Sequence, residues 1–222
     1  MFSTPDEAIF SGKNNDNLEL LLAWAGTTVA YAIVQAGAAN LLSGIFVQAL
    51  AISGVVCGLG FVFHELAHRI VARHYGAQAH FVADKRWLGM SILIAFAGFF
   101  IAAPGAVWHR GRLTLQQGGL IALAGPVTNL VLAVLFIFLL PVLVLANQRE
   151  DWVVSLCVTG VRLNAWLGLF NMIPAGPFDG AKVLAWNKVV FGVTVAVAFV
   201  LTFVIPSNLA AIWGALLGLF GN

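Results

Sequence analysis

The chain has 222 residues, of which 61% are hydrophobic and 9% are charged, and its formal net charge is +2. Because soluble domains usually contain about 25% charged residues, this composition excludes a soluble protein and predicts an integral membrane protein. The small net charge, without a basic tract or a set of base-stacking aromatic residues, excludes a nucleic-acid partner. Cys57 and Cys157 lie in apolar runs, where a free thiol behaves as a small hydrophobe, so no disulfide framework is expected.

Residues 1–17 are predicted to form a polar N-terminal tail. They are net acidic, whereas a signal peptide begins with a basic segment and ends at a small-residue cleavage site. We therefore expect the tail to be retained and residues 18–222 to form a single membrane domain.

The apolar runs predict an all-α polytopic membrane protein with about five to six transmembrane helices. A spanning helix needs roughly 20 mostly apolar residues. The tail at 207–222 has fewer and is predicted to be a partial or interfacial segment. The predicted spans are residues 18–38, a run from 41 that continues through 76, and residues 115–146, 152–173 and 183–205.

Residues 88–107 are short for a span, rich in glycine and closed by a Pro-Gly pair. Lys and Arg favour the cytoplasmic side of short loops, and a crossing here would divide six of them between the two faces. A segment that enters and returns keeps all six on one face. We therefore predict a re-entrant or β-hairpin segment near residues 80–114, with an ordinary sixth span as the alternative. The six residues are Arg69, Arg73, Lys85, Arg86, Arg110 and Arg112.

The second span ends in HELAH, which contains His64, Glu65 and His68. Residues four apart share one face of a helix, so the two imidazoles can bind one metal ion. In the H-E-x-x-H pattern the metal is zinc, and the glutamate takes a proton from its water. Ionisable side chains at membrane depth are costly and indicate function. The alternative is that these residues only line a helix end near the headgroups.

A catalytic zinc site needs a third protein ligand and an open position. The other acidic residues belong to the tail, the edge of the first span, or loops, which leaves Asp179. It lies in NMIPAGPFDG, residues 171–180, where Pro174 and Pro177 must interrupt the helix near the membrane. A crossing at 88–107 would put Asp179 on the wrong side, so the metal geometry also favours re-entry.

The combination of these motifs resembles the site-2 protease family of intramembrane zinc metalloproteases, over roughly residues 45–182. The resemblance implies cleavage of a membrane-anchored substrate in or near its transmembrane segment, with one Zn²⁺ held by His64, His68 and Asp179. It implies that Glu65 is the general base and that Asn171 contacts the substrate backbone or steadies the oxyanion. An asparagine cap or kink partner is the alternative for Asn171. The motifs are HELAH at 64–68, AGP at 124–126 with Asn129, and Asn171, Pro174, Asp179 and Gly180.

Gly125 and Pro126 are expected to permit close helix approach beside the site, with Asn129 bonding across helices rather than acting in catalysis. The region 85–114 resembles the membrane-associated hairpin of the family, including AAPGAV. Its strand could pair with an extended substrate, or the loop could only plug the cytoplasmic face. His74, His80 and His109 are explained by solvated or interfacial positions without a metal.

Two other functions compete with a protease located in the cell membrane with its active site toward the cytoplasm. One is a catalytically inactive homologue that binds membrane proteins, which would not need Glu65. The other is a metal-ion transporter, which would need further acidic or histidine residues along a path, and the remaining spans offer none. The expected partners are a transmembrane protein substrate and the lipid bilayer; the sequence indicates neither the substrate's identity nor the oligomeric state.

Overall fold

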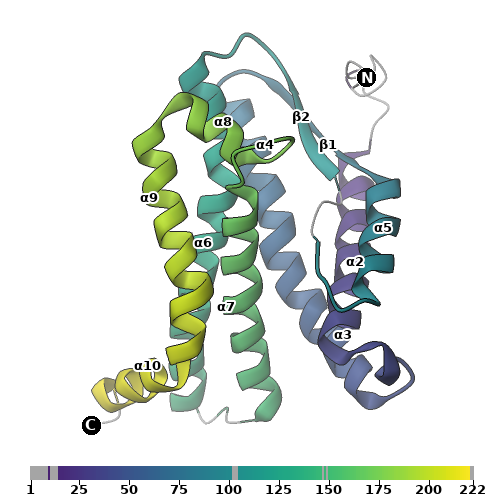
Figure 1. Cartoon of the computed structure of the whole chain (residues 1–222), viewed down its shortest axis with the longest axis vertical. Coiled ribbons are helices and arrows are strands. Elements are labelled where there is room, and N and C mark those ends of the chain that lie inside the picture. The colour runs from purple at the N-terminus through teal and green to yellow at the C-terminus, as the bar shows by residue number, and fades with distance from the viewer. Residues whose placement is uncertain (1–9, 11–14, 102–104, 147, 149, 221–222) are drawn as a thin grey trace.

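The computed structural model describes residues 10, 15–101, 105–146, 148 and 150–220. Most of the predicted tail, part of AAPGAV and Arg149 lie outside these ranges. Helices form the bulk of the described chain, with one small hairpin at the end that carries α8 (Figure 1). The elements are α2 (Asp16–Ala36), α3 (Gly44–Cys57), the π-helical turn η2 (Gly58–Val62), α4 (Phe63–His74), β1 (Gln78–Ala83), α5 (Lys85–Ala95), β2 (Gly105–Arg110), α6 (Leu115–Leu145), α7 (Asp151–Asn171), α8 (Asp179–Trp186), α9 (Lys188–Phe199), the π-helical turn η3 (Val200–Val204) and α10 (Ile205–Phe220).

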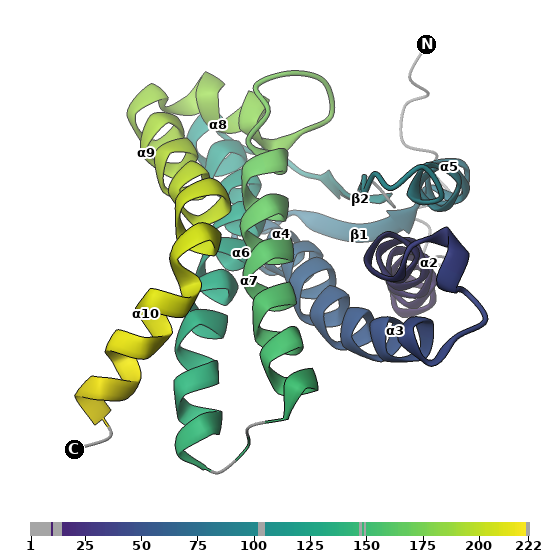
Figure 2. The same cartoon turned by 60° about the horizontal axis from the view of Figure 1, so that its bottom comes forward.

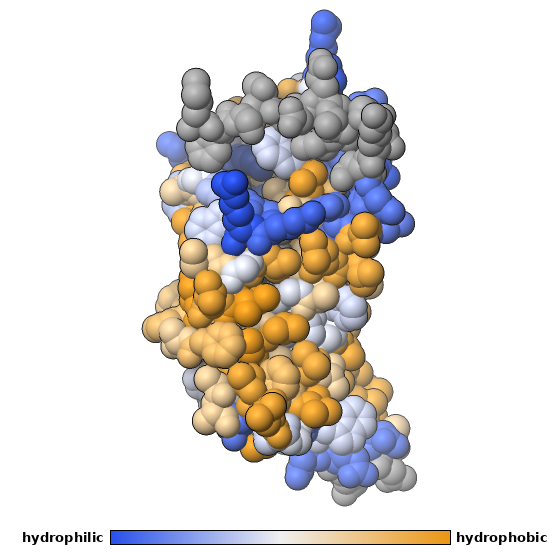
Figure 3. All heavy atoms as spheres, turned by 90° about the vertical axis from the view of Figure 1, so that its right-hand side faces the viewer, coloured by the Kyte–Doolittle hydropathy of each residue, from blue (hydrophilic) through white to orange (hydrophobic). Residues whose placement is uncertain are grey.

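Five helical segments of the described chain are long and apolar enough to cross a membrane, which confirms the prediction of a multi-pass membrane protein. The face in Figure 3 has a broad hydrophobic band between more hydrophilic ends, as a protein that crosses a bilayer requires. The segments are Asp16–Ala36, Gly44–His74, Leu115–Leu145, Asp151–Asn171 and Lys188–Leu219.

The last span differs from the sequence prediction at both ends. It begins at Lys188 rather than at residue 183, because the backbone of Asn187 leaves the helical region and its side chain caps Val189 and Val190. The chain also remains helical through α10, which turns away from α9 at the opposite end from α8 (Figures 1 and 2). Trp213 donates a 2.7 Å hydrogen bond to the carbonyl of Ile137 and so attaches α10 to α6.

The segment between the second and third spans returns to the face it came from. Helix α5 has 11 residues, about half of what a span needs. It connects β1 and β2, which pair antiparallel from Gln78 opposite Arg110 to Ala83 opposite Gly105. The prediction of a re-entrant or β-hairpin segment is therefore confirmed, and an ordinary sixth span is wrong for this region.

Two carboxylates of α2 fix the hairpin in place. Asp16 pairs with Arg69 of α4 at 3.2 Å and with His80 of β1 at 3.0 Å. Glu19 accepts a 3.0 Å hydrogen bond from the backbone N–H of Ala83. These contacts hold β1, and through it β2, beside the C-terminal half of α4.

Close packing between α6 and α7 depends on small residues, as is usual for helices that associate in membranes. A Cβ atom at Gly160 of α7 would collide with the ring of Phe136 of α6, which is itself buried. Gly168 of α7 is in a similar position against Leu130. These glycines allow α7 to approach α6 closely enough to share the polar contacts described below.

We predict that Gly160→Ala destabilises the protein by about 1–3 kcal/mol, the usual cost of overpacking a well-packed site. Gly192→Ala is the matched control, since a Cβ atom there meets nothing within 4 Å and alanine favours a helix by up to about 1 kcal/mol. Thermal unfolding of both variants in detergent should show a lower midpoint for Gly160→Ala only. Equal midpoints would contradict the close packing of α6 and α7.

Candidate metal centre

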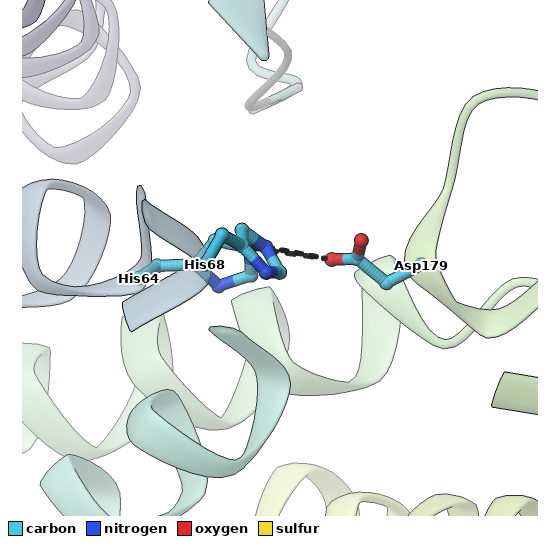
Figure 4. A group of neighbouring side chains, drawn as sticks. All are labelled: His64, His68 and Asp179. Atoms are coloured by element: carbon cyan, nitrogen blue, oxygen red, sulfur yellow. Dashed lines mark hydrogen bonds and ion pairs between the residues drawn. The ribbon is translucent and has the colours of Figure 1, made fainter. Parts of the chain in front are cut away.

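Three buried side chains from two distant segments meet at one point, at the end of the bundle that carries the hairpin (Figure 4). His64 and His68 lie one turn apart on α4, and Asp179 is the first residue of α8. The Nε2 atoms of the two histidines are 3.0 Å apart. Oδ2 of Asp179 lies 3.4 Å from Nε2 of His64 and 3.1 Å from Nε2 of His68. All three residues have less than a tenth of their surface exposed.

The outer nitrogen of each imidazole has a fixed acceptor. Nδ1 of His68 is 2.7 Å from the carbonyl oxygen of Ile121, which can only accept, so this nitrogen carries the proton. Nδ1 of His64 is 2.5 Å from Oδ1 of Asn129, whose amide nitrogen is already used as a donor elsewhere. Both Nε2 atoms therefore direct lone pairs toward the carboxylate of Asp179.

This donor set fits a divalent metal ion. Two imidazole lone pairs and a carboxylate oxygen at 3.0–3.4 Å repel one another unless positive charge lies among them. A proton joins only one pair of these atoms, whereas a metal ion satisfies all three. Two histidines and one carboxylate also match the ligand types of catalytic zinc sites.

Asn129 of α6 connects His64 to two other helices. Its amide nitrogen donates to the carbonyl of Gly60 at 3.0 Å and to Oδ1 of Asn164 at 3.1 Å. Asn164 in turn donates to the carbonyl of Gly160 at 2.9 Å. Gly60 belongs to the π-helical turn η2 just before the histidines, and such turns are frequent at functional sites. This chain of contacts, which we call the amide relay, fixes the orientation of the His64 ring.

Asp179 reaches the histidines because the chain turns sharply after α7. Gly176 has a φ of 61°, a left-handed conformation that favours glycine. Gly180 approaches the carbonyl of Met172 so closely that a Cβ atom would collide with it. Phe178 packs edge-to-face on Phe170, with ring centres 4.9 Å apart. The start of α8 is thereby held against the end of α7.

Gly125 lies directly against the two imidazoles. A Cβ atom at this position would collide with Nε2 of both His64 and His68. Gly125 therefore leaves the space that the imidazoles, and an ion between them, require. The neighbouring Pro126 lacks an N–H, so the turn of α6 that supplies the Ile121 carbonyl has one backbone hydrogen bond fewer.

A pocket of about 70 Å³ opens on the three residues. Glu65 lines it together with the predicted substrate contact Asn171, whose side chain also donates to Leu167 within its own helix. Pro174 is exposed in the turn and does not line the pocket. The other polar lining residues are His109 of β2 and Lys182 of α8.

Charges and burial set the ionisation state of this end of the pocket. Burial alone would raise the pKa of Asp179, but the imidazoles of His68 and His64 outweigh it and hold the pKa below its ordinary value. Asp179 is therefore a carboxylate. Burial, with the nearby positive charge of Lys182, lowers the pKa of His109, so this side chain is neutral at pH 7.

Some of these polar residues were missed by sequence reasoning. Asn164 lies in an apolar span, where a polar side chain that is buried must find a partner, so its position was a usable signal. The sequence predicts a solvated or interfacial position for His109, but this side chain lines the pocket. Lys182 lies just before the predicted last span, where a positive charge is expected near the membrane surface. Nothing in its local sequence distinguishes a lysine that faces the pocket from one that faces water.

Comparison with known proteins identifies several relatives. "Putative zinc metalloprotease MJ0611" of Methanocaldococcus jannaschii is 43% identical over 145 residues, which cover 64% of this chain and 73% of the relative. "Putative zinc metalloprotease YwhC" of Bacillus subtilis is 33% identical over 57% of this chain and 64% of the relative. "Zinc metalloprotease MJ0392" of M. jannaschii is 27% identical over 71% of this chain and 40% of the relative. No protein-family model and no solved structure matches the sequence.

A membrane-spanning bundle that buries a His-His-Asp group, with ligand atoms close enough to share one metal ion, defines a multi-pass membrane protein with a candidate metal centre. The chain belongs to the zinc metalloprotease family of the site-2 protease type.

Gly125→Ala is expected to displace the imidazoles and lower the affinity for a divalent metal ion by tenfold or more, about 1.4 kcal/mol. Gly118→Ala is the matched control on the same helix, because a Cβ atom there has nothing within 4 Å. Metal content after dialysis against a weak chelator measures the effect. Full metal content in Gly125→Ala would show that the imidazoles tolerate the added methyl group.

Asn129→Leu is expected to reduce metal affinity by about 10–100-fold, the usual effect of removing the partner that orients a metal-binding histidine. Asn129→Asp keeps an oxygen for Nδ1 of His64 and should retain more of the affinity than the leucine variant. Thr128→Val is the control, because that hydroxyl bonds only to Ala124 within its own helix. The order of the three metal affinities tests the amide relay, and equal affinities would refute it.

Proposed function

We propose that the protein is an intramembrane zinc metalloprotease that hydrolyses peptide bonds in or near the transmembrane segments of membrane-anchored substrates. The observation that carries the proposal is the buried meeting of His64, His68 and Asp179 beside Glu65 in one pocket. Residues 18–222 act as a single protease domain in this proposal, with a catalytic core at about 45–182.

His64, His68 and Asp179 would hold one Zn²⁺, with its remaining coordination open to the pocket. Zinc bound there would polarise the substrate carbonyl and lower the pKa of a water molecule. The amide relay and the Ile121 carbonyl keep both histidines in the tautomer that a metal ligand needs.

Glu65 is the general base of the proposed reaction. It follows His64 directly on α4, is buried, and lines the same pocket as the three ligands. Its carboxylate accepts a proton from the attacking water and returns it to the leaving amine. Asn171 and Lys182 also line the pocket, and their side chains can donate hydrogen bonds to the oxyanion or to the substrate backbone.

Strand β2 is the proposed clamp for the substrate. Its residues 105–107 and 109 line the pocket, and β1 pairs along its other side. A peptide must leave the helical conformation before its bonds are accessible, because a helix satisfies its own backbone groups. Pairing of the unwound segment with β2 would replace those hydrogen bonds next to Glu65.

The positive charges support an active site toward the cytoplasm of the cell membrane. The basic residues of α4, α5, α8 and the hairpin, together with Lys188 at the start of α9, lie at span ends or in short connections on the face that carries the pocket. Short loops with this bias remain on the cytoplasmic side.

Glu65→Gln should retain one zinc ion per chain and cleave a model transmembrane substrate about 10²–10⁴-fold more slowly, the usual contribution of general acid–base catalysis. Asp179→Ala should lose both zinc and cleavage. Zinc stoichiometry and peptide cleavage, measured on the same preparations, give the two readouts.

Two other outcomes would refute the proposal. If the wild type binds the substrate without cleaving it, and Glu65→Gln binds it equally well, the protein is an inactive homologue that holds membrane proteins. Zinc flux into vesicles that changes with Glu65→Gln would indicate a transporter.

A further inference from the structure

A second and larger cavity lies on the membrane-facing part of the molecule. Its volume is about 690 Å³, and apolar and aromatic side chains make up most of its wall. They come from α2, from the chain that follows α5, from α7, and from the junction of η3 with α10. Representative wall residues are Tyr31, Val34, Phe99, Phe100, Trp166 and Phe170.

Arg162 also lines this cavity, and its position is unusual. It lies about halfway along α7, a candidate membrane span, and its side chain is exposed. At 1.5 Å per residue it is about 16 Å from the start of the helix, near the middle of a hydrocarbon core about 30 Å thick. A guanidinium at this depth is costly and indicates a functional partner.

The described part of the chain supplies no carboxylate that forms an ion pair with Arg162. Asp16, Glu19 and Asp179 bind other partners at the end of the spans that carries the hairpin. Asp151 is the first residue of α7 and so lies about 16 Å along the helix from Arg162. The polar residues that share the cavity with Arg162 are neutral. Gln35 donates to Thr159, and Thr202 donates to Ala198 within its own helix.

We propose that this cavity receives the membrane-spanning segment of the substrate, and that Arg162 selects segments that carry a carboxylate at mid-membrane depth. The proposal rests on the proposed function and names the substrate class for that site. The apolar wall suits the side chains of a transmembrane helix. Arg162, for which the described residues supply no ion-pair partner, can hold an anion there. A lipid phosphate is a poorer partner, because headgroups lie about half a bilayer thickness away from this depth.

Consecutive residues near the end of α7 line the two cavities, which makes the proposal specific about position. Phe170 lines the large cavity and Asn171 lines the catalytic pocket. Trp166 stacks on Phe170, which in turn contacts Phe178 next to Asp179. Arg162 and Asn171 are nine residues apart, or about 13–14 Å along the helix. The acidic residue should therefore lie about nine residues from the scissile bond if the segment between them is helical, and about four if it is extended.

The test uses full-length protein with Glu65→Gln, so that bound substrate is not consumed, in phosphatidylcholine nanodiscs at pH 8. The probes are two fluorescent Leu-Ala transmembrane peptides that differ only in a central Glu or Gln. We expect the Glu peptide to bind about tenfold more tightly, in the range of interhelical polar contacts, and Arg162→Leu to abolish the difference. Arg162→Lys should keep part of the preference, which separates charge from folding.

Arg86→Leu is the matched control, since Arg86 is exposed near the start of α5 and does not line the cavity. It should leave the preference for the Glu peptide unchanged. Equal affinity for the two peptides, or a preference that survives Arg162→Leu, overturns the proposal. A preference for the Glu peptide that is lost when phosphatidylglycerol is added also overturns the proposal, because a lipid anion is then the partner of Arg162.

Cleavage of both peptides by the wild type distinguishes a failure of the docking site from a failure of the proposed protease function. Selective binding without any cleavage would refute the protease and leave the docking site. Cleavage of both peptides at the same rate, with no binding preference, would refute the docking site and leave the protease. A peptide series with the Glu moved one residue at a time should cleave fastest when it lies four to nine residues from the scissile bond.

Discussion

The site depends on one buried side chain, Asn129, which satisfies groups on three helical segments at once. Its oxygen accepts from His64, and its nitrogen donates to Gly60 of the π-helical turn and to Asn164 of α7. In a lipid-embedded bundle there is no water to replace any of these contacts. The relative positions of α4, α6 and α7 must therefore keep this amide fully bonded, and that requirement fixes the position of His64.

Glycines permit the approach that this amide requires. Gly60 lies against Asn164, Gly125 against the imidazoles, and Gly160 against Phe136, so three close helix contacts near the relay are made where one partner has no Cβ atom. Apolar attraction between helices is weak in lipid, and close packing with a few buried polar contacts takes its place. The same small residues thus serve both the stability of the bundle and the space for the metal.

Much of this arrangement could be predicted from the sequence, because it follows from local rules. The four-residue spacing of His64 and His68 fixes their shared face, and the Pro-Gly turn before Asp179 fixes where a helix must end. The distribution of Lys and Arg residues predicted that the segment 88–107 returns to the face from which it enters. Partners across helices are set by tertiary packing. The apolar neighbours of Asn164 therefore indicate that its side chain needs a buried partner but not which one, and the neighbours of His109 do not indicate that it lines the pocket. Arg162 could have been identified from the sequence. It lies within a predicted span, and the cost of ionisable groups in lipid, which indicates a function for His64, applies equally to Arg162.

The two cavities impose different conformations on any chain that occupies both. The large cavity has apolar walls and offers few backbone partners, so a segment inside it must remain helical to satisfy its own N–H and C=O groups. The pocket is bordered by β2, which can pair only with an extended chain. The transition between these conformations must therefore occur between the two cavities, and Phe170, which lines the first, and Asn171, which lines the second, place it near the end of α7. A segment held at Arg162 on one side and at β2 on the other would be unwound next to Glu65, where hydrolysis requires an accessible peptide bond.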